Sequence, residues 1–329
     1  NIDLGGADRV LVSLAEHVRG LPALPLRALV LLRQDGSAAR LHALAGTAAL
    51  LSPFRRPQLS GGVFRAVLVS ITWPVSIVRL VRVIRAQDPD VVHVNDLYDF
   101  LPSLAAKLCG VPVVHHVRMI RSGRGQRRLV RALLGGVSDR VVSVSAAVQK
   151  AYVDPAGDGS SPWRVIHDHA RPELWVESAG GVERPASLAG DRSLVVMLGR
   201  IEPWKGQHVF LEAVAALPQA TREAVDFAIA GGTVPGKEQY AVEIAAAAER
   251  LGVRYLGEVE DVRGLLLNSD VAVHASTEPD PFPGTVVEAL LAGCAVVGAD
   301  DGGVRELIPN EQVGLRFRSG DARSLTDRL

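Results

Sequence analysis

The sequence predicts an α/β protein built from two doubly wound parallel sheets. Short β-branched runs alternate with longer amphipathic segments, as in parallel sheets with crossover helices. The alternation is interrupted once, from Val176 to Arg192, by a stretch rich in Gly, Ser and Pro that predicts a linker. With 329 residues, 48% of them hydrophobic, the chain has enough apolar surface for two cores. We therefore expect domains at residues 1–185 and 186–329.

The expected strands form two series, one in each domain. The first series is Arg27 to Leu32, Val91 to Val94, Val111 to His115, Val141 to Val144 and Arg164 to Ile166. The second is Leu194 to Leu198, Asp226 to Ala230, Val253 to Leu256, Val271 to His274 and Ala295 to Ala299. Apolar residues at helical spacing lie between them, as from Val209 to Leu217, and indicate the crossover helices.

The charge is balanced overall but not along the chain. The 36 basic and 36 acidic residues give no net charge, which argues against a nucleic-acid-binding protein. Residues 1–185, however, carry 23 basic and 15 acidic residues, and residues 186–329 carry 13 and 21. Arginines in the first domain occur at helical spacing from Arg79 to Arg85 and crowd from Arg118 to Arg131. They predict a surface that attracts phosphorylated acceptors or anionic lipid headgroups, the latter through peripheral contact with an anionic membrane. Solvated arginines on the backs of helices are the alternative.

The cysteines and the apolar segments bear on the compartment. Cys109 and Cys294 are too few and too distant for a disulfide framework or a zinc site, so we expect the reducing cytoplasm. The longest apolar stretch, Ala66 to Val78, is shorter than the roughly 20 residues of a spanning helix. We therefore expect a cytoplasmic protein, at most peripheral at the inner membrane surface.

Two glycine-containing turns are candidate phosphate sites. In the second domain, Arg200 and Lys205 follow the strand Leu194 to Leu198 and precede a helix. Cations at the carboxyl end of a parallel strand, beside a helix N-terminus, suit a diphosphate. The glycine pair at Gly5 and Gly6 also precedes an amphipathic helix, although such a pair is often an ordinary turn.

A carboxylate pair lies after the strand Val271 to His274. Asp280 is in a proline-rich loop, and Glu288 follows in a helix expected to begin near Gly284 and to end at Gly293. We expect one carboxylate to meet a sugar and the other to bind ribose hydroxyls, as an acidic residue does in dinucleotide folds. A glutamate that merely points to solvent is the alternative for Glu288.

These motifs, in this order, resemble glycosyltransferase family 4. The resemblance spans nearly the whole chain and is carried by Gly199 to Gly206, Gly231-Gly232, Gly257 to Val259, Ser269 to Val271, Asp280 to Glu288 and Gly302-Gly303, and in the first domain by Gly5 to Arg9, Pro89 to His93, Gly110 to Val114 and Asp139 to Ser145. It implies the GT-B fold, in which two Rossmann-like domains face a cleft, the first binding the acceptor and the second the nucleotide-sugar donor. The family also has elements before and after these motifs, so we expect a chain truncated at both ends.

The resemblance also implies roles for single residues. Arg200 and Lys205 hold the donor diphosphate, and Asp280 meets the donor sugar. Glu288 binds the ribose, and His116 lies against the sugar. Backbone N–H groups of Gly6, Gly284, Thr285 and Val286 complete the donor site, and no metal ion or other cofactor is expected because the two cations neutralise the diphosphate. The family usually has glutamate where this chain has Asp280, which leaves Glu278 as an alternative contact to the sugar.

The resemblance implies a retaining glycosyltransferase. The donor is a UDP- or GDP-sugar, and the acceptor a cell-envelope glycan or glycolipid, that is, a carbohydrate or lipid-linked acceptor. A GT-B-fold epimerase or phosphorylase and a non-catalytic nucleotide-sugar-binding fragment are the alternatives. An NAD-dependent oxidoreductase is disfavoured because no Gly-x-Gly-x-x-Gly turn follows a strand. A metal-dependent transferase needs an Asp-x-Asp motif at the end of a strand. It is disfavoured because Asp88-Pro89-Asp90, which has this spacing, precedes a strand.

Overall fold

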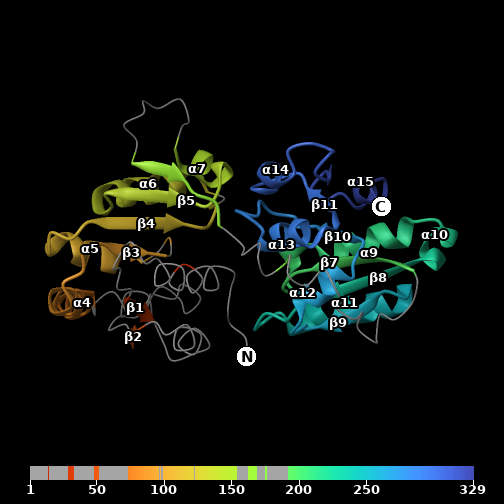
Figure 1. Cartoon of the computed structure of the whole chain (residues 1–329), viewed down its shortest axis with the longest axis horizontal. Helices are drawn as coiled ribbons and strands as arrows, with labels where there is room; N and C mark the ends of the chain where they lie inside the picture. The colour runs from red at the N-terminus through yellow and green to blue at the C-terminus, as the bar shows by residue number, and fades with distance from the viewer. Residues whose placement is uncertain are drawn as a thin grey trace. The chain divides into compact units, whose positions relative to one another are not determined.

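The computed structural model describes residues 29–32, 48–51, 73–95, 99–121, 123–153, 162–168 and 192–329, together with residues 14, 97 and 175. The chain divides into two compact units, Asn1–Asp168 and His169–Leu329. Each unit contains parallel β-structure (Figure 1). The expected boundary between residues 185 and 186 lies outside the described residues.

The described strands of the first unit form two parallel sheets. Strands β1 (Leu29–Leu32) and β2 (Ala48–Leu51) pair with each other. The second sheet has the order β3-β4-β5-β6, made of β3 (Val92–Val94), β4 (Val113–Val117), β5 (Arg140–Ser143) and β6 (Trp163–Val165). Helices α4 (Trp73–Gln87), α5 (Phe100–Leu108), α6 (Arg124–Val137) and α7 (Ala146–Tyr152) alternate with these strands.

The second unit holds a six-stranded parallel sheet of order β12-β11-β10-β7-β8-β9. Its strands are β7 (Ser193–Leu198), β8 (Val225–Ala230), β9 (Arg254–Gly257), β10 (Val271–His274), β11 (Ala295–Ala299) and β12 (Leu315–Phe317). The connecting segments are η3 (Pro203–Lys205), α9 (Gln207–Ala216), α10 (Gln219–Ala224), α11 (Glu238–Leu251), α12 (Val262–Leu267), α13 (Gly284–Ala292), α14 (Val304–Leu307) and α15 (Ala322–Thr326).

Alternating residues of β7 explain why helices cover both faces of this sheet. Val195 and Met197 belong to a core cluster with residues of α9 and α11, whereas Leu194 and Val196 belong to a second cluster with residues of α12 and α13. A strand buried on both faces is apolar throughout, as β7 is, and such strands are typical of doubly wound sheets. The chain runs outward from β7 to β9 and then returns to β10 on the other side of β7. Strand order therefore reverses between β7 and β10, where such sheets bind ligands.

The predicted strands agree with the structure to within one or two residues at each described end. Strand β4 differs most: Val111 to His115 was expected, and Val113–Val117 is observed. The amide of Val111 donates to the Ala106 carbonyl after helix α5, and Pro112 has no N–H for a ladder, so pairing begins at Val113. Strands β2 and β12 were not predicted. None of the helices in the described segments is long and apolar enough to cross a bilayer.

Candidate functional site

The carboxyl ends of β7 and β10 bring two of the predicted site segments together. After β7 the chain passes through Arg200 and η3, and after β10 it passes through the loop that contains Asp280. The Thr277 amide donates to the Trp204 carbonyl over 2.8 Å, which ties the two segments to each other. The two strands pair directly, so loops that lie 75 residues apart in sequence form one edge.

Lys205 and Asp280 form a buried ion pair at this edge. The Lys205 Nζ lies 2.6 Å from Asp280 Oδ2, and the side chains are 17% and 7% exposed. The ammonium also lies 4.0 Å from the centre of the Trp204 ring. A third group, His274 Nε2, lies 3.3 Å from the same carboxylate oxygen and 3.0 Å from Ser276 Oγ. The lysine and the aspartate were predicted from the sequence, but their contact and the histidine were not.

The Lys205 and His274 side chains keep Asp280 ionised. Burial by itself raises the pKa of the Asp280 carboxyl, but the hydrogen bond from His274 and the charge of Lys205 outweigh it and hold that pKa below its usual range. A buried carboxylate that loses such a partner is strongly destabilising. Asp280 therefore depends on Lys205 and His274 for its charged state.

Arg200 is more accessible than Lys205. Its Nη2 lies 2.7 Å from Glu202 Oε1, and its side chain is 57% exposed. The backbone of Arg200 is held by a hydrogen bond, because Gln207 at the start of α9 donates from Nε2 to the Arg200 carbonyl over 2.8 Å. Gln207 in turn accepts from the Tyr240 hydroxyl. An exposed guanidinium on a fixed backbone is suited to meet an anion from solvent.

Glycine permits the close contact between the two loops. Gly206 has φ +80°, and a Cβ built there would lie 1.9 Å from the carbonyl oxygen of Ala275. Gly302, after β11, has φ +55°, and a Cβ there would lie 2.2 Å from the Asp280 carbonyl oxygen. Both contacts are shorter than any side chain allows. Gly206 and Gly302 thus hold the Lys205 and Asp280 segments against their neighbours.

Helix α13 begins beside this edge and has the predicted bounds. It runs from Gly284 to Ala292 and is followed by Gly293 in the left-handed conformation. The first N–H groups of a helix have no acceptor within it, and Gly284 and Thr285 occupy these positions. The Val286 amide was also predicted to bind an anion, and in this structure it donates to the Pro283 carbonyl over 3.1 Å. Glu288 lies one turn further on and is half-buried.

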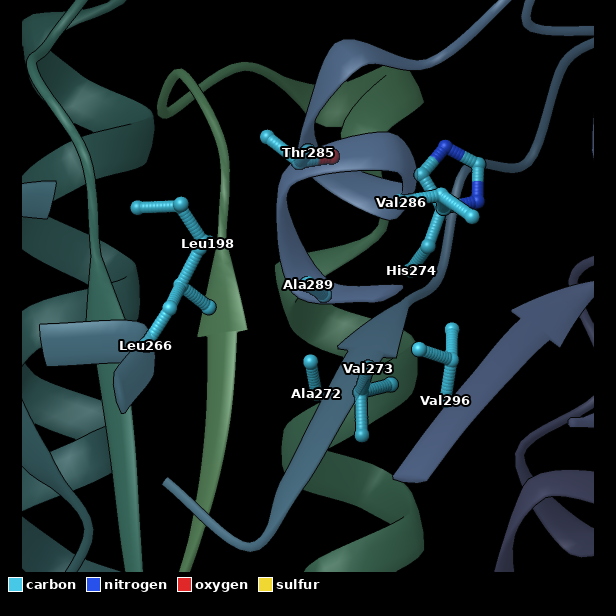
Figure 2. A pocket seen from close by; sticks show the side chains of 9 residues that line it. All are labelled: Leu198, Leu266, Ala272, Val273, His274, Thr285, Val286, Ala289 and Val296. Carbon is cyan, nitrogen blue, oxygen red and sulfur yellow. The ribbon is translucent and has the colours of Figure 1, made fainter. Parts of the chain in front are cut away.

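A small pocket lies under the start of α13. Figure 2 shows Thr285 and Val286 of α13 on one side of it, with Leu198 at the end of β7 and His274 at the end of β10. The remaining lining residues are apolar: Leu266, Ala272, Val273, Ala289 and Val296. His274 is 5% exposed, and its Nδ1 has no hydrogen-bond partner within the described part of the chain. His274 was not predicted as a site residue, because a single histidine at a strand end carries no distinguishing pattern.

The first unit has its own cluster of polar side chains at the carboxyl ends of its strands. His116 lies inside β4, is 8% exposed, and its Nδ1 lies 3.2 Å from Arg118 Nη2. Arg118 also donates from Nε to Asn95 Oδ1 over 2.9 Å and forms an ion pair with Asp168. Burial, reinforced by the charge of Arg118, lowers the pKa of His116 to about 2. His116 is therefore neutral, and its Nε2 is buried without a partner among the residues that the structure describes.

The remaining predicted groups are placed as follows. Gly6 lies outside the described residues. Glu278 is exposed, in contrast to the buried Asp280 two residues later. In the described segments no three His, Cys, Asp or Glu side chains converge as metal ligands.

Family models match both parts of the chain. The model described as "Glycosyltransferase Family 4" matches residues 4–169, and the model described as "Glycosyl transferases group 1" matches residues 183–329. The chain belongs to glycosyltransferase family 4. The resemblance stated from the motifs is thereby confirmed.

Curated relatives in this family have several substrates in their names. The glycogen synthase of Mycobacterium tuberculosis is 28% identical over 258 residues, which cover 73% of this chain and 59% of the relative. A Campylobacter jejuni N,N'-diacetylbacillosaminyl-diphospho-undecaprenol α-1,3-N-acetylgalactosaminyltransferase is 29% identical over 138 residues, 42% of this chain and 35% of the relative. The chain thus spans about three fifths of the length of the glycogen synthase.

Solved structures confirm the predicted fold class. The structure of Anabaena Alr3699/HepE in complex with UDP superimposes with a TM-score of 0.79 and 25% identity, covering 98% of this chain and 85% of that one. A glycosyltransferase from Rickettsia africae has a TM-score of 0.78 at 17% identity, and shows the fold alone. The family 4 chain therefore has the expected GT-B architecture of Rossmann-like parallel-sheet domains.

Proposed function

We propose that this family 4 protein is a retaining glycosyltransferase that uses a UDP- or GDP-sugar. The observation that carries the proposal is the buried Lys205–Asp280 pair at the switch point of the second sheet, beside the exposed Arg200. Two cations at this edge offer N–H donors to the oxygens of a diphosphate. The Anabaena neighbour was solved with UDP, and also with UDP and glucose, which favours UDP over GDP.

In the proposed reaction the bond between the sugar C1 and the diphosphate oxygen breaks, and its electron pair stays on the departing phosphate. Arg200 and Lys205 stabilise this growing negative charge more in the transition state than in the ground state. The acceptor hydroxyl attacks C1 on the face that the diphosphate leaves, and passes its proton to a departing phosphate oxygen. Attack on that face retains the anomeric configuration.

The other residues take the roles that the family resemblance implies. Glu288 binds ribose hydroxyls, and the N–H groups of Gly284 and Thr285 face the diphosphate. Asp280, held by Lys205 and His274, contacts the donor sugar. In the first unit, His116 acts as a neutral donor to a sugar hydroxyl through Nε2, because Arg118 occupies its Nδ1.

A cell-envelope glycan or a lipid-linked glycan is the proposed acceptor class. The Campylobacter relative is named for a diphospho-undecaprenol acceptor, and the yeast relatives for phosphatidylinositol, so lipid-linked substrates occur within the matched group. Glycogen in the name of the mycobacterial relatives marks a soluble polysaccharide as the competing class.

Nucleotide release from a panel of UDP- and GDP-sugars tests the proposal. We expect UDP or GDP to form with at least one donor, faster when an acceptor extract is added. Products analysed by NMR should show the anomeric configuration of the donor. An epimerase would convert the donor sugar to its epimer without net transfer to an acceptor. A phosphorylase would require inorganic phosphate for glycosidic cleavage. A non-catalytic module would bind nucleotide and release none.

A further inference from the structure

The helices that accompany the four-stranded sheet of the first unit form a continuous layer. Helices α4 and α5 pack together, as do α5 and α6, and α6 and α7. Leu80 and Ile84 of α4 and Leu101 and Ala105 of α5 share a core cluster with Val94 and Val113 of the sheet. The inner side of this helix layer therefore packs on the sheet, and its outer side faces away from the sheet.

No acidic residue occurs in any of these four helices. Together they contain nine Lys and Arg residues: Arg79, Arg82, Arg85, Lys107, Arg124, Arg127, Arg128, Arg131 and Lys150. Helices α9, α10 and α11 of the second unit instead carry acidic residues, among them Glu212, Glu223, Glu238, Glu243 and Glu249. The excess positive charge of the first domain is thus concentrated in one structural layer.

The same layer carries apolar side chains that face solvent. On α4, Val75 and Val78 are 54% and 49% exposed. They share the outer side of the helix with the exposed Arg79, Arg82 and Arg85, because these residues lie opposite the buried Ser76, Leu80 and Ile84. Large apolar residues are also exposed along the other helices of the layer: Leu104, Leu108, Leu129 and Leu133, with Trp73 at the start of α4.

We infer that the outer side of α4 to α6, which we call the basic apolar layer, docks on the surface of an anionic lipid bilayer. Arginines attract anionic headgroups, while neighbouring valine and leucine side chains enter the boundary between headgroups and acyl chains. A nucleic acid would satisfy the arginines but not the exposed aliphatic groups, so the combination favours lipid. The inference extends the proposed function, since a lipid-linked acceptor is met at a bilayer.

Vesicle sedimentation tests this docking without any turnover. The wild-type chain should sediment with phosphatidylcholine vesicles that contain phosphatidylglycerol and not with pure phosphatidylcholine vesicles. Raising the salt from about 0.1 to about 1 M should release it, because the screening length falls from about 10 to about 3 Å. The double variant Arg82→Gln, Arg85→Gln should bind about 30-fold more weakly.

A matched control separates the layer from overall charge. Arg250→Gln with Arg323→Gln removes the same charge from exposed positions of the second unit and should leave vesicle binding unchanged. Val75→Ser with Val78→Ser keeps every charge and should still weaken binding, whereas a purely ionic contact would not respond. Circular dichroism should show all three double variants to be folded.

Three results would overturn the inference: no binding to anionic vesicles, equal losses in the two arginine double variants, or tighter binding to duplex DNA than to vesicles. UDP titration of the same samples keeps the proposed function separate. If the chain binds UDP but not vesicles, only the docking is refuted. If it binds vesicles but not UDP, the docking stands and the donor assignment is refuted.

Discussion

The carboxyl ends of the parallel strands carry different chemistry in the two units. In the second unit two ion pairs lie at the β7–β10 edge, one between Lys205 and Asp280 and one between Arg200 and Glu202. In the first unit the guanidinium of Arg118 is already paired with Asp168, and the neutral His116 has no partner for Nε2 among the described residues. Two similar folds thus present charge at one edge and a neutral hydrogen-bond donor at the other. We expect the charged edge to govern nucleotide binding and the neutral edge to govern behaviour on acidification.

Removing the ammonium of the charged edge should have the largest effect. Lys205→Ala should lower turnover about 100-fold, the scale of losing one well-placed donor to a developing anion. Steady-state nucleotide release measures this, with Lys237→Ala as a control, since Lys237 is an exposed lysine at the start of α11 in the same unit. Equal rates for the two variants would remove Lys205 from the mechanism.

Adding a side chain at the contact between the two loops should have the second largest effect. Gly206→Ala places a Cβ against the Ala275 carbonyl as well as imposing a left-handed conformation, so we expect it to lower the free energy of unfolding by about 3 kcal/mol. Gly236 has φ +82° but open space around it, and Gly236→Ala should cost only about 1 kcal/mol. Urea titrations give both values. Similar costs would show that backbone conformation, and not the loop contact, matters at Gly206.

The ribose contact should contribute less. Glu288→Ala should weaken UDP binding about tenfold, the value of one or two hydrogen bonds to a charged group. Isothermal titration calorimetry measures the affinity, and Glu212→Ala is the control because Glu212 is an exposed acid on α9. Unchanged affinity in the Glu288 variant would refute the assignment.

The smallest effect concerns the neutral edge. Because folding lowers the pKa of His116, the unfolded chain binds a proton that the folded chain does not, as the pH falls below 6.5. The contribution of His116 to the free energy of unfolding is therefore fully present above pH 6.5. It is lost as the pH falls from 6.5 to about 2, by at most about 1.4 kcal/mol per pH unit. Asp280, whose pKa is also lowered, begins to lose its contribution only below its ordinary pKa of 3.8.

Urea titrations at pH 7 and pH 5 separate these two groups. The wild-type chain should lose stability over this interval, and His116→Gln should lose less. His167→Gln, at an exposed histidine of the same unit, should behave as the wild type. An unchanged pH dependence in His116→Gln would show that another group is responsible.

The sequence predicted the second unit better than the first for physical reasons. Its strand β7 is apolar after its first residue, and glycines mark the bounds of α13, as at Gly293. Strand β2, Ala48–Leu51, contains only alanine and leucine, which favour helices, and β12, Leu315–Phe317, is three residues long. Neither carries a strand pattern.

The site was predicted as residue types and not as contacts. Arg200 and Lys205 could be selected because they directly follow a strand that was itself predictable. The Lys205–Asp280 pair depends on β10 lying beside β7, which strand order alone decides. Gln207, His274 and Ser276 were missed because their importance comes from burial, which has no local pattern. The predicted roles of the site residues remain predictions.

Calorimetric titration of UDP and GDP into the wild-type chain and into Lys205→Ala tests the central claim most directly. We predict that the wild-type chain binds at least one of the two nucleotides and that the variant binds it at least tenfold more weakly. Wild-type affinity in the variant, or no binding of either nucleotide to the wild-type chain, would contradict a diphosphate site at the β7–β10 edge.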